Sequence, residues 1–364
     1  MRKSAFIIAC VFSAGCSGLI SGKSLPGQGS EVAKRYLMAK IPELLPGEIA
    51  LAVMGESTER EDLLFVYKSE KITGINRNDI IFGEFFKSKK NNAKLAVLLP
   101  GKGESISTDW PARTLAERGF DVVRFLAKFT IFDLTLLDRK ERFTKTEFEG
   151  FAKVVADTFE TRYNDYLNII TKLKEANSYS RIGISGVSLG GISAYYLSGA
   201  HPEIFQSTVG ITTGGDLAGI LMSSAESGIE RIREEIFKKF GIAEDEALKI
   251  LRAELKHIDP LSVAKNINPE SALLVSNILD SVIPHRFTKK LWEAANRPTW
   301  KLAVIKIPIF WLRDYSFWLD GHYSAGLALF VPIPLFEFWG PFLLPGMPST
   351  LDFLIVRHFE RTLK

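Results

Sequence analysis

The stretch that most constrains the fold is residues 181–200, because it predicts a strand, a sharp turn and a helix in immediate succession. An apolar run at 182–184 leads into Gly-Val-Ser-Leu-Gly at 186–190, and the residues from 192 onward suit a helix. Glycines two positions before and two after the serine let the strand and helix backbones approach closely. Such a turn strains and exposes the serine. Ser188 is therefore a candidate nucleophile, provided that a base and an acid can reach it.

Apolar runs alternate with helical patterns on both sides of this turn. Strands are predicted at 63–67, 80–86, 94–100, 121–125, 207–211, 272–276 and 301–305. Residues 301–305 are the last clear strand of the chain. Helices are predicted at 31–45, 109–118, 148–176, 285–295 and 351–363. This alternation predicts an α/β fold, with a mostly parallel central sheet and helices on both faces.

Residues 214–268 are too long for a simple crossover between strands. Helical patterns at 229–240 and 244–255, with charged and apolar positions interleaved, predict solvated helices. We interpret the segment as a helical cap inserted over the carboxyl edge of the sheet. The alternative is a set of peripheral helices with no part in the site.

A serine nucleophile needs a base, and the chain has five histidines. His322 follows the last predicted strand in a loop, Asp-Gly-His-Tyr-Ser, and a flanking glycine lets such a loop deliver an imidazole to the turn. The other four are predicted at structural positions. His201 ends a helix, His257 lies in the cap, His285 starts a helix and His358 lies in the middle of the last helix. We therefore expect His322 to be the base.

The base in turn needs a carboxylate that orients it. Asp280 follows the strand at 272–276 in a loop, where its side chain can reach inward. Asp259, Asp314 and Asp320 compete for this role. Asp259 precedes a proline and suits the start of a helix or turn, and Asp320 is too close in sequence to His322, so Asp280 is preferred.

The chain order serine, aspartate, histidine resembles that of the α/β-hydrolase superfamily. The resemblance covers roughly residues 60–364, and its matching pieces are residues 95–103, 186–191, 274–284 with its Asp-x-x-x-Pro ending, and 321–323. It implies that Ser188 is the nucleophile, Asp280 the acid and His322 the base.

The resemblance also implies an oxyanion hole built from backbone N–H groups. The matching positions are Leu189, after the nucleophile, and Lys102, with Gly103 as the alternative. Two departures stand out. The usual His-Gly start of the loop is Pro100-Gly101 here, and the apolar stretch that leads to His322 is longer than is typical of the family.

The N-terminus has the pattern of an export signal. Arg2 and Lys3 precede an apolar run at 5–12, and Ser-Ala-Gly-Cys follows at 13–16. These four residues resemble a bacterial lipobox, which implies lipidation of Cys16, although a serine occupies the usual leucine position. We expect a signal peptide at 1–15, a lipidated tether at 16–31 and an α/β-hydrolase domain at 32–364. An ordinary cleaved signal is the alternative.

Composition limits the partners. Of the two cysteines, Cys10 would leave with the signal peptide and Cys16 would carry the lipid, which leaves the mature domain without a disulfide or a cysteine metal site. A net charge of +4 with no basic block argues against nucleic acid. We expect no metal and no organic cofactor. Ser17 after the lipidated cysteine favours the outer membrane, so we expect an envelope lipoprotein that faces the periplasm or the cell surface.

These inferences predict a serine hydrolase that cleaves an acyl bond through an acyl-enzyme. A carboxylic ester, small or lipid, is favoured, while thioester and amide bonds stay open. Residues 306–346, rich in tryptophan and phenylalanine, either fill a core or form an acyl or membrane-facing surface. The alternative function is an inactive envelope protein that keeps the fold for binding or scaffolding.

Overall fold

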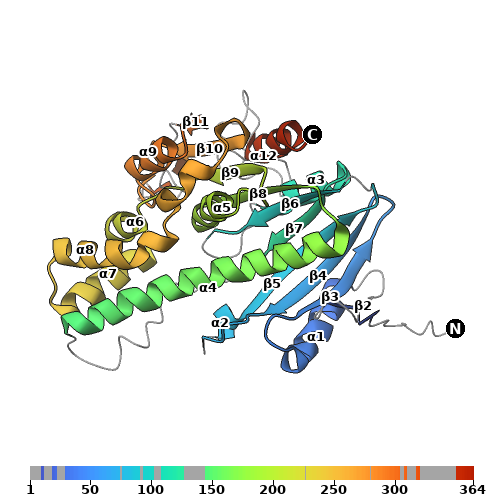
Figure 1. Ribbon diagram of the computed structural model, residues 1–364, viewed down its shortest axis with the longest axis horizontal. Helices are drawn as coiled ribbons and strands as arrows, with labels where there is room; N and C mark the ends of the chain where they lie inside the picture. The colour runs from blue at the N-terminus through green and yellow to red at the C-terminus, as the bar shows by residue number, and fades with distance from the viewer. Residues whose placement is uncertain are drawn as a thin grey trace. The chain divides into compact units, whose positions relative to one another are not determined.

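The computed structural model describes residues 10–11, 19–22, 29–73, 76–90, 93–101, 108–126, 144–225, 227–278, 280–303, 307–309, 317–319 and 350–364. The chain divides into two compact units. Figure 1 labels their helices and strands. The first consists mainly of Met1–Thr130 and Thr161–Gly183, and the second mainly of Ile131–Glu160 and Ile184–Thr362.

The first unit is built on strands in the order β1-β2-β3-β4-β5-β7-β6. Strands β3, β4, β5 and β7 pair in antiparallel fashion, whereas β6 is parallel to β7. The strands are β1 (Cys10–Val11), β2 (Leu19–Gly22), β3 (Ile49–Glu56), β4 (Arg60–Lys68), β5 (Ile80–Ser88), β6 (Lys94–Leu99) and β7 (Asp121–Phe125). The helices are α1 (Gly29–Lys40), the short 3-10 helix η1 (Ile41–Glu43), α2 (Asn76–Asp79), α3 (Asp109–Glu117) and the second half of α4 (Lys145–Asn177).

Helices cover both faces of β4, because successive side chains of a strand point to opposite faces. Leu64 and Val66 belong to one core cluster with Leu37 of α1. The alternate residue Phe65 packs edge-to-face on Phe125 at 5.7 Å between ring centroids, and Phe125 contacts Tyr166 of α4. Helices α1 and α4 therefore lie on opposite faces of this strand.

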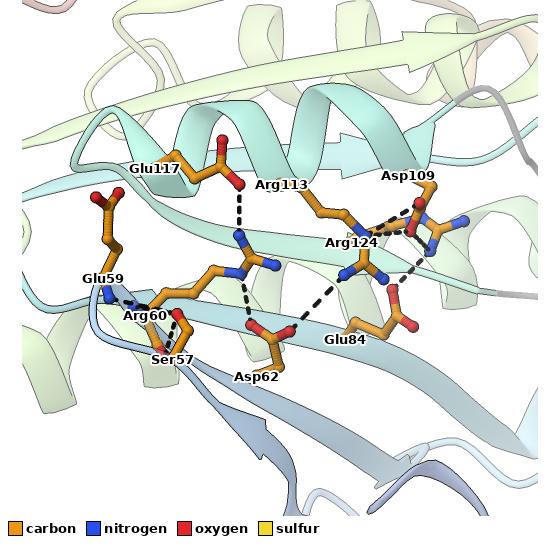
Figure 2. A network of polar contacts seen from close by, with 9 residues as sticks. All are labelled: Ser57, Glu59, Arg60, Asp62, Glu84, Asp109, Arg113, Glu117 and Arg124. Atoms are coloured by element: carbon orange, nitrogen blue, oxygen red, sulfur yellow. Dashed lines mark hydrogen bonds and ion pairs between the residues drawn. The ribbon is translucent and has the colours of Figure 1, made fainter. Parts of the chain in front are cut away.

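A network of charged side chains, which we name the arginine network, lies on the sheet beside α3 (Figure 2). Arg124 of β7 contacts Glu84 of β5 at 2.6 Å and Asp109 of α3 at 3.2 Å. Its members are Arg60, Arg113 and Arg124 with Asp62, Glu84, Asp109 and Glu117. Each arginine in it contacts two carboxylates, so every cation of the network lies between anions.

The second unit continues from β8 (Arg181–Val187), which begins in the first. Its strand order is β8-β9-β10-β11, and the pairs of β10 with β9 and with β11 are parallel. The remaining strands are β9 (Ser207–Ile211), β10 (Ala272–Asn277), β11 (Thr299–Ala303) and the antiparallel pair β12 (Ile307–Ile309) and β13 (Phe317–Leu319). The α-helices are α5 (Leu189–Ala200), α6 (Leu217–Ser223), α7 (Ser227–Phe240), α8 (Glu244–Leu255), α9 (His285–Ala294) and α12 (Thr350–Thr362). Short 3-10 helices are η4 (Lys256–Ile258), η5 (Pro260–Ser262), η6 (Ala264–Asn266) and η7 (Pro269–Ser271).

Helices also cover both faces of β9. The hydroxyl of Thr208 donates to Ser198 of α5 at 2.7 Å, while its neighbour Ser207 accepts from Thr362 of α12 at 2.8 Å. Adjacent strand residues face opposite ways, so α5 and α12 lie on opposite sides of the strand. This is the layered α/β arrangement that the sequence predicts.

The predicted elements are largely confirmed, but β1, β2 and α2 were not predicted, and further differences concern β11, β3 and α1. The strand predicted at 301–305 is β11, which ends at Ala303, and β12 and β13 follow it. Strand β3 was not predicted; its burial on both faces gives it no alternating pattern. The helix predicted at 31–45 ends at Lys40, where Pro42 starts a 3-10 turn. Among the described helices, none combines the length and the apolar character that crossing a membrane requires.

Candidate active site

Ser188 occupies the sharp turn between β8 and α5, as the sequence predicts. Its backbone has φ 55° and ψ −120°, the geometry of the first central residue of a type II′ turn, which is normally glycine. A serine held there carries strain of about 1–3 kcal/mol. Strain of this kind persists only where the surrounding packing enforces it, and it concentrates at functional sites.

The packing that enforces the turn is visible at Gly186 and Gly191. A Cβ atom on Gly186 would lie 2.1 Å from the carbonyl oxygen of Gly190, so the strand and helix backbones are nearly in contact there. A Cβ atom on Gly191 would lie 2.8 Å from the Cβ of Thr213. No side chain fits at 186 without moving the helix, which explains the glycine in the pattern.

Backbone hydrogen bonds connect the turn to the neighbouring strands. The N–H of Ser188 donates to the carbonyl of Ile211, the last residue of β9, at 2.8 Å. Ile211 is in register with Val275 of β10, and the N–H of Thr212 donates to the Val275 carbonyl at 2.7 Å. The carboxyl ends of β9 and β10 are thereby aligned with the serine. Ligands of open α/β sheets bind outside this edge.

Asp280 lies in the loop that leaves β10, close to the same edge. The residue is buried, with 5% of its surface exposed. Its Oδ1 accepts hydrogen bonds from the backbone N–H groups of Val282 at 2.9 Å and Ile283 at 2.8 Å. These bonds fix the carboxylate in a loop that ends at Pro284, where α9 begins. The position suits an acid that orients a base, although His322 lies outside the described residues.

The four other histidines take the structural positions predicted for them. His201 ends α5, His257 lies in η4 and His285 begins α9. His358 of α12 is buried, and its Nε2 lies 2.9 Å from the Ser271 carbonyl. Burial lowers the pKa of His358, as it lowers that of His285.

The predicted oxyanion donors are described only in part. Leu189 is the first residue of α5, so its N–H belongs to the helix turn that has no intrahelical acceptors. Lys102 and Gly103 lie outside the described residues, as does Cys16. The first turn of α5 also carries the positive end of the helix dipole, which favours negative charge.

A charged cluster at the start of α6 was not predicted. Asp216, at φ 66°, caps α6 by accepting from the N–H of Gly219 at 3.1 Å. Its Oδ2 contacts Arg252 at 2.9 Å and Lys290 at 2.5 Å. Burial acts to raise the pKa of Asp216, but the hydrogen bonds from Arg252, Lys290 and the Gly219 N–H, together with the charge of Lys290, hold the pKa below its usual value. Only the Gly-Gly-Asp sequence at 214–216 could have signalled an unusual turn.

The rival acid Asp259 supports the same loop. Its carboxylate accepts from the N–H groups of Asp216, Leu217 and Leu261, and it caps η5, as its place before Pro260 predicts. Burial raises its pKa despite these bonds. The Asp259 carboxylate is thus occupied by hydrogen bonds from backbone N–H groups. In the part of the chain that the structure describes, no three His, Cys, Asp or Glu side chains form a group suited to a metal ion.

Comparisons with known proteins agree with this geometry at the level of the fold. No family model and no curated protein matches the sequence. Among solved structures, acetyl xylan esterase 1 from Thermoanaerobacterium sp. superposes with a TM-score of 0.50 and 18% identity, covering 77% of this chain and 86% of that one. The acetyl xylan esterase from Paenibacillus sp. superposes with a TM-score of 0.51 and 14% identity, covering 80% and 91%. The chain has the α/β-hydrolase fold. At these identities the likeness concerns the fold alone.

Proposed function

We propose that this protein is a serine hydrolase that cleaves a carboxylic ester through an acyl-enzyme. The observation that carries the proposal is the strained backbone of Ser188, held by Gly186 at the carboxyl edge of the strands. The buried Asp280, in the adjacent loop, supplies the carboxylate that a triad requires. His322 completes the proposal as the base, on the strength of the chain order alone.

In the proposed mechanism, the Ser188 hydroxyl attacks the ester carbonyl while His322 takes its proton. The tetrahedral intermediate collapses as the bond to the alcohol breaks, and His322 returns the proton to the departing oxygen. Water then attacks the acyl-serine with His322 again as base, which releases the carboxylic acid and restores the serine. Asp280 holds the imidazole and stabilises its cationic form.

The N–H of Leu189 is the proposed first donor to the oxyanion, and that of Lys102 the second. Removing one such donor typically costs about 3–4 kcal/mol of transition-state stabilisation. The choice of an ester rests on analogy with the fold and with the named esterases, so thioester and amide substrates are tested alongside it.

A fluorophosphonate probe tests the nucleophile. The wild-type protein should be labelled covalently, and Ser188→Ala should not be. Ser193→Ala, which changes a buried serine of the same helix, is the matched control and should label normally. Labelling that survives in Ser188→Ala would remove Ser188 from the mechanism. Loss of ester turnover in His322→Ala but not in His285→Ala would identify the base.

We also propose that lipidated Cys16 anchors the enzyme to the bacterial envelope, with the outer membrane favoured. The support is the leader pattern alone. Detergent partitioning of the wild type against Cys16→Ser tests it: the variant should leave the membrane fraction, and unchanged partitioning would count against the anchor.

A further inference from the structure

The loop that follows β9 contains a second strained residue beside the serine turn. Thr212 is buried and has φ 44°, a backbone conformation that β-branched residues adopt only as outliers. It directly follows Ile211, whose carbonyl accepts the hydrogen bond from the Ser188 N–H. Two strained residues that are not glycine, Ser188 and Thr212, therefore flank one backbone hydrogen bond. Strain of this kind persists only where the packing around it maintains it.

The next residue, Thr213, packs against the first turn of α5. Its side chain is fully buried. A Cβ atom on Gly191 would lie 2.8 Å from the Thr213 Cβ and 3.0 Å from its hydroxyl oxygen, and one on Gly210 of β9 would lie 2.6 Å from its methyl group. Contacts this short leave no room for a side chain at either glycine. Thr213 therefore fills the space between β9 and the helix turn that follows Ser188.

The side chain of Thr213 contributes its shape rather than a hydrogen bond. The hydroxyl oxygen is buried and has no hydrogen-bond partner among the described residues. A valine has nearly the same shape and avoids the cost of burying an unpartnered hydroxyl. Valine at this position should therefore keep the contacts with the two glycines, which makes it the conservative variant for a test.

The main chain of Thr213 connects the turn to the element that follows the Asp280 loop. The hydroxyl of Thr288 donates to the Thr213 carbonyl at 2.6 Å, and this bond is buried. Thr288 lies in the first turn of α9, which begins directly after Pro284 at the end of that loop. Thr213 thus contacts both the helix that follows the candidate nucleophile and the helix that follows the candidate acid.

We propose that Thr213 is a positioning residue that holds Ser188 in its strained conformation and in register with the Asp280 loop. The proposal rests on the proposed function, since it concerns the same nucleophile. Thr213 acts through Gly191 and the first turn of α5, and it needs no contact with the substrate. Without the branched side chain this turn relaxes toward β9, and the serine loses both its strain and its alignment.

Labelling rates test the effect on reactivity. The rate constant for reaction with a fluorophosphonate should fall about tenfold or more in Thr213→Ala, because a small displacement of a reacting group is enough for such a loss. Thr213→Val restores the shape and should return the rate to near the wild-type value. Thr213→Ser, which loses only the methyl group, should lie between the two and replaces the alanine variant if that variant does not fold.

The matched control is Thr208→Ala, which truncates another buried threonine that faces α5 and also removes its hydrogen bond to Ser198. It should lower the melting temperature at least as much as Thr213→Ala and leave the labelling rate of the folded protein unchanged. An unchanged rate in Thr213→Ala and Thr213→Ser, a loss of rate in Thr213→Val, or an equal loss in Thr208→Ala would overturn the proposal.

Thermal unfolding tests the strain without any turnover. Ser188→Gly should raise Tm, because glycine adopts φ 55° without steric cost. In the Thr213→Ala or Thr213→Ser background the same change should raise Tm clearly less, because the turn has already relaxed, whereas in Thr208→Ala it should raise Tm in full. Equal shifts in every background would contradict the coupling. If the wild-type protein is not labelled at all, the proposed function fails, while this comparison still decides whether Thr213 holds the turn.

Discussion

The serine turn and the arginine network show two different ways of using polar residues at a sheet. The turn of the second unit has no charged side chain in its sequence 186–191, yet it holds a serine in a backbone geometry that favours glycine. The arginine network of the first unit has seven ionised side chains, whose opposite charges lie in contact (Figure 2). Of the two, only the turn holds its residue in a strained backbone conformation.

The difference indicates where reactivity should be sought. Matched charges stabilise one another and leave little tendency to react with a ligand. A strained serine at the carboxyl edge is maintained against its local preference, which is the stronger sign of function. The following predictions test this contrast, from the largest expected effect to the smallest.

Gly186→Ala should have the largest effect on stability. The new methyl group would meet the backbone of Gly190, which cannot move without displacing α5. The free energy of unfolding should fall by about 4 kcal/mol, at the upper end of single substitutions, and probe labelling should disappear. Chemical denaturation measures the change. Gly150→Ala in α4, where a Cβ atom meets nothing within 4 Å, is the control and should be neutral or slightly stabilising.

Arg124→Ala should lower the free energy of unfolding by about 3 kcal/mol, because it leaves the mostly buried Glu84 without its closest cation. Probe labelling per folded molecule should stay normal. Arg113→Ala, whose side chain is 44% exposed, should cost less than about 1 kcal/mol. A large loss of labelling in folded Arg124→Ala would mean that the arginine network contributes to function.

Asp165 of α4 is a buried carboxylate without the ion pairs of the arginine network, so it tests how such a group affects the free energy of unfolding. Its Oδ1 accepts from Ser69 at 2.9 Å, and Oδ2 has no hydrogen-bond partner within the described chain. Burial raises its pKa to about 7, although Arg162 and Ser69 act against the rise. The folded protein therefore binds this proton more tightly than the unfolded chain, whose aspartate has a pKa near 3.8.

Stability from this proton is present below the unfolded pKa and is lost as the pH rises toward 7. Between pH 5 and pH 6 this group by itself should lower the free energy of unfolding by about 1.4 kcal/mol. Asp165→Asn should remove this contribution to the slope in urea titrations at the two pH values, whereas Glu175→Gln, on the exposed side of the same helix, should keep the wild-type slope. An unchanged slope in Asp165→Asn would show that the carboxylate is ionised when folded.

Ser188→Gly should have the smallest effect and the most specific one. Glycine adopts φ 55° without steric cost, so the variant should gain about 1 kcal/mol of stability while losing its labelling. Ser188→Ala keeps the Cβ atom and should gain nothing. Calorimetry on the two inactive variants isolates the strain from the loss of the hydroxyl, and equal stabilities would contradict it.

The sequence predicted the parts of the fold whose signal is local. Residues 121–125 and 207–211 each contain β-branched residues, which favour strands, and form β7 and β9 with the predicted bounds. The glycines at 186 and 190 predict the turn. Asp280 was preferred from its place after a strand; the residue is buried, and its role as the acid stays a prediction. What escaped prediction depends on distant partners. Asp216 belongs to a charged cluster because it contacts Arg252 and Lys290, and no local sequence pattern links those three positions.

The covering of β9 has a consequence for the kinetics of folding. Its α5 side is completed by a neighbour in sequence, since Thr208 contacts Ser198 only 10 residues away. The contact on its α12 side is made by Thr362, which is 155 residues beyond Ser207. Contacts across such separations form slowly, because a long loop must close before they contribute. We therefore expect β9, whose last residue accepts the hydrogen bond from Ser188, to reach its final packing late, so that refolding regains helix content before it regains probe labelling.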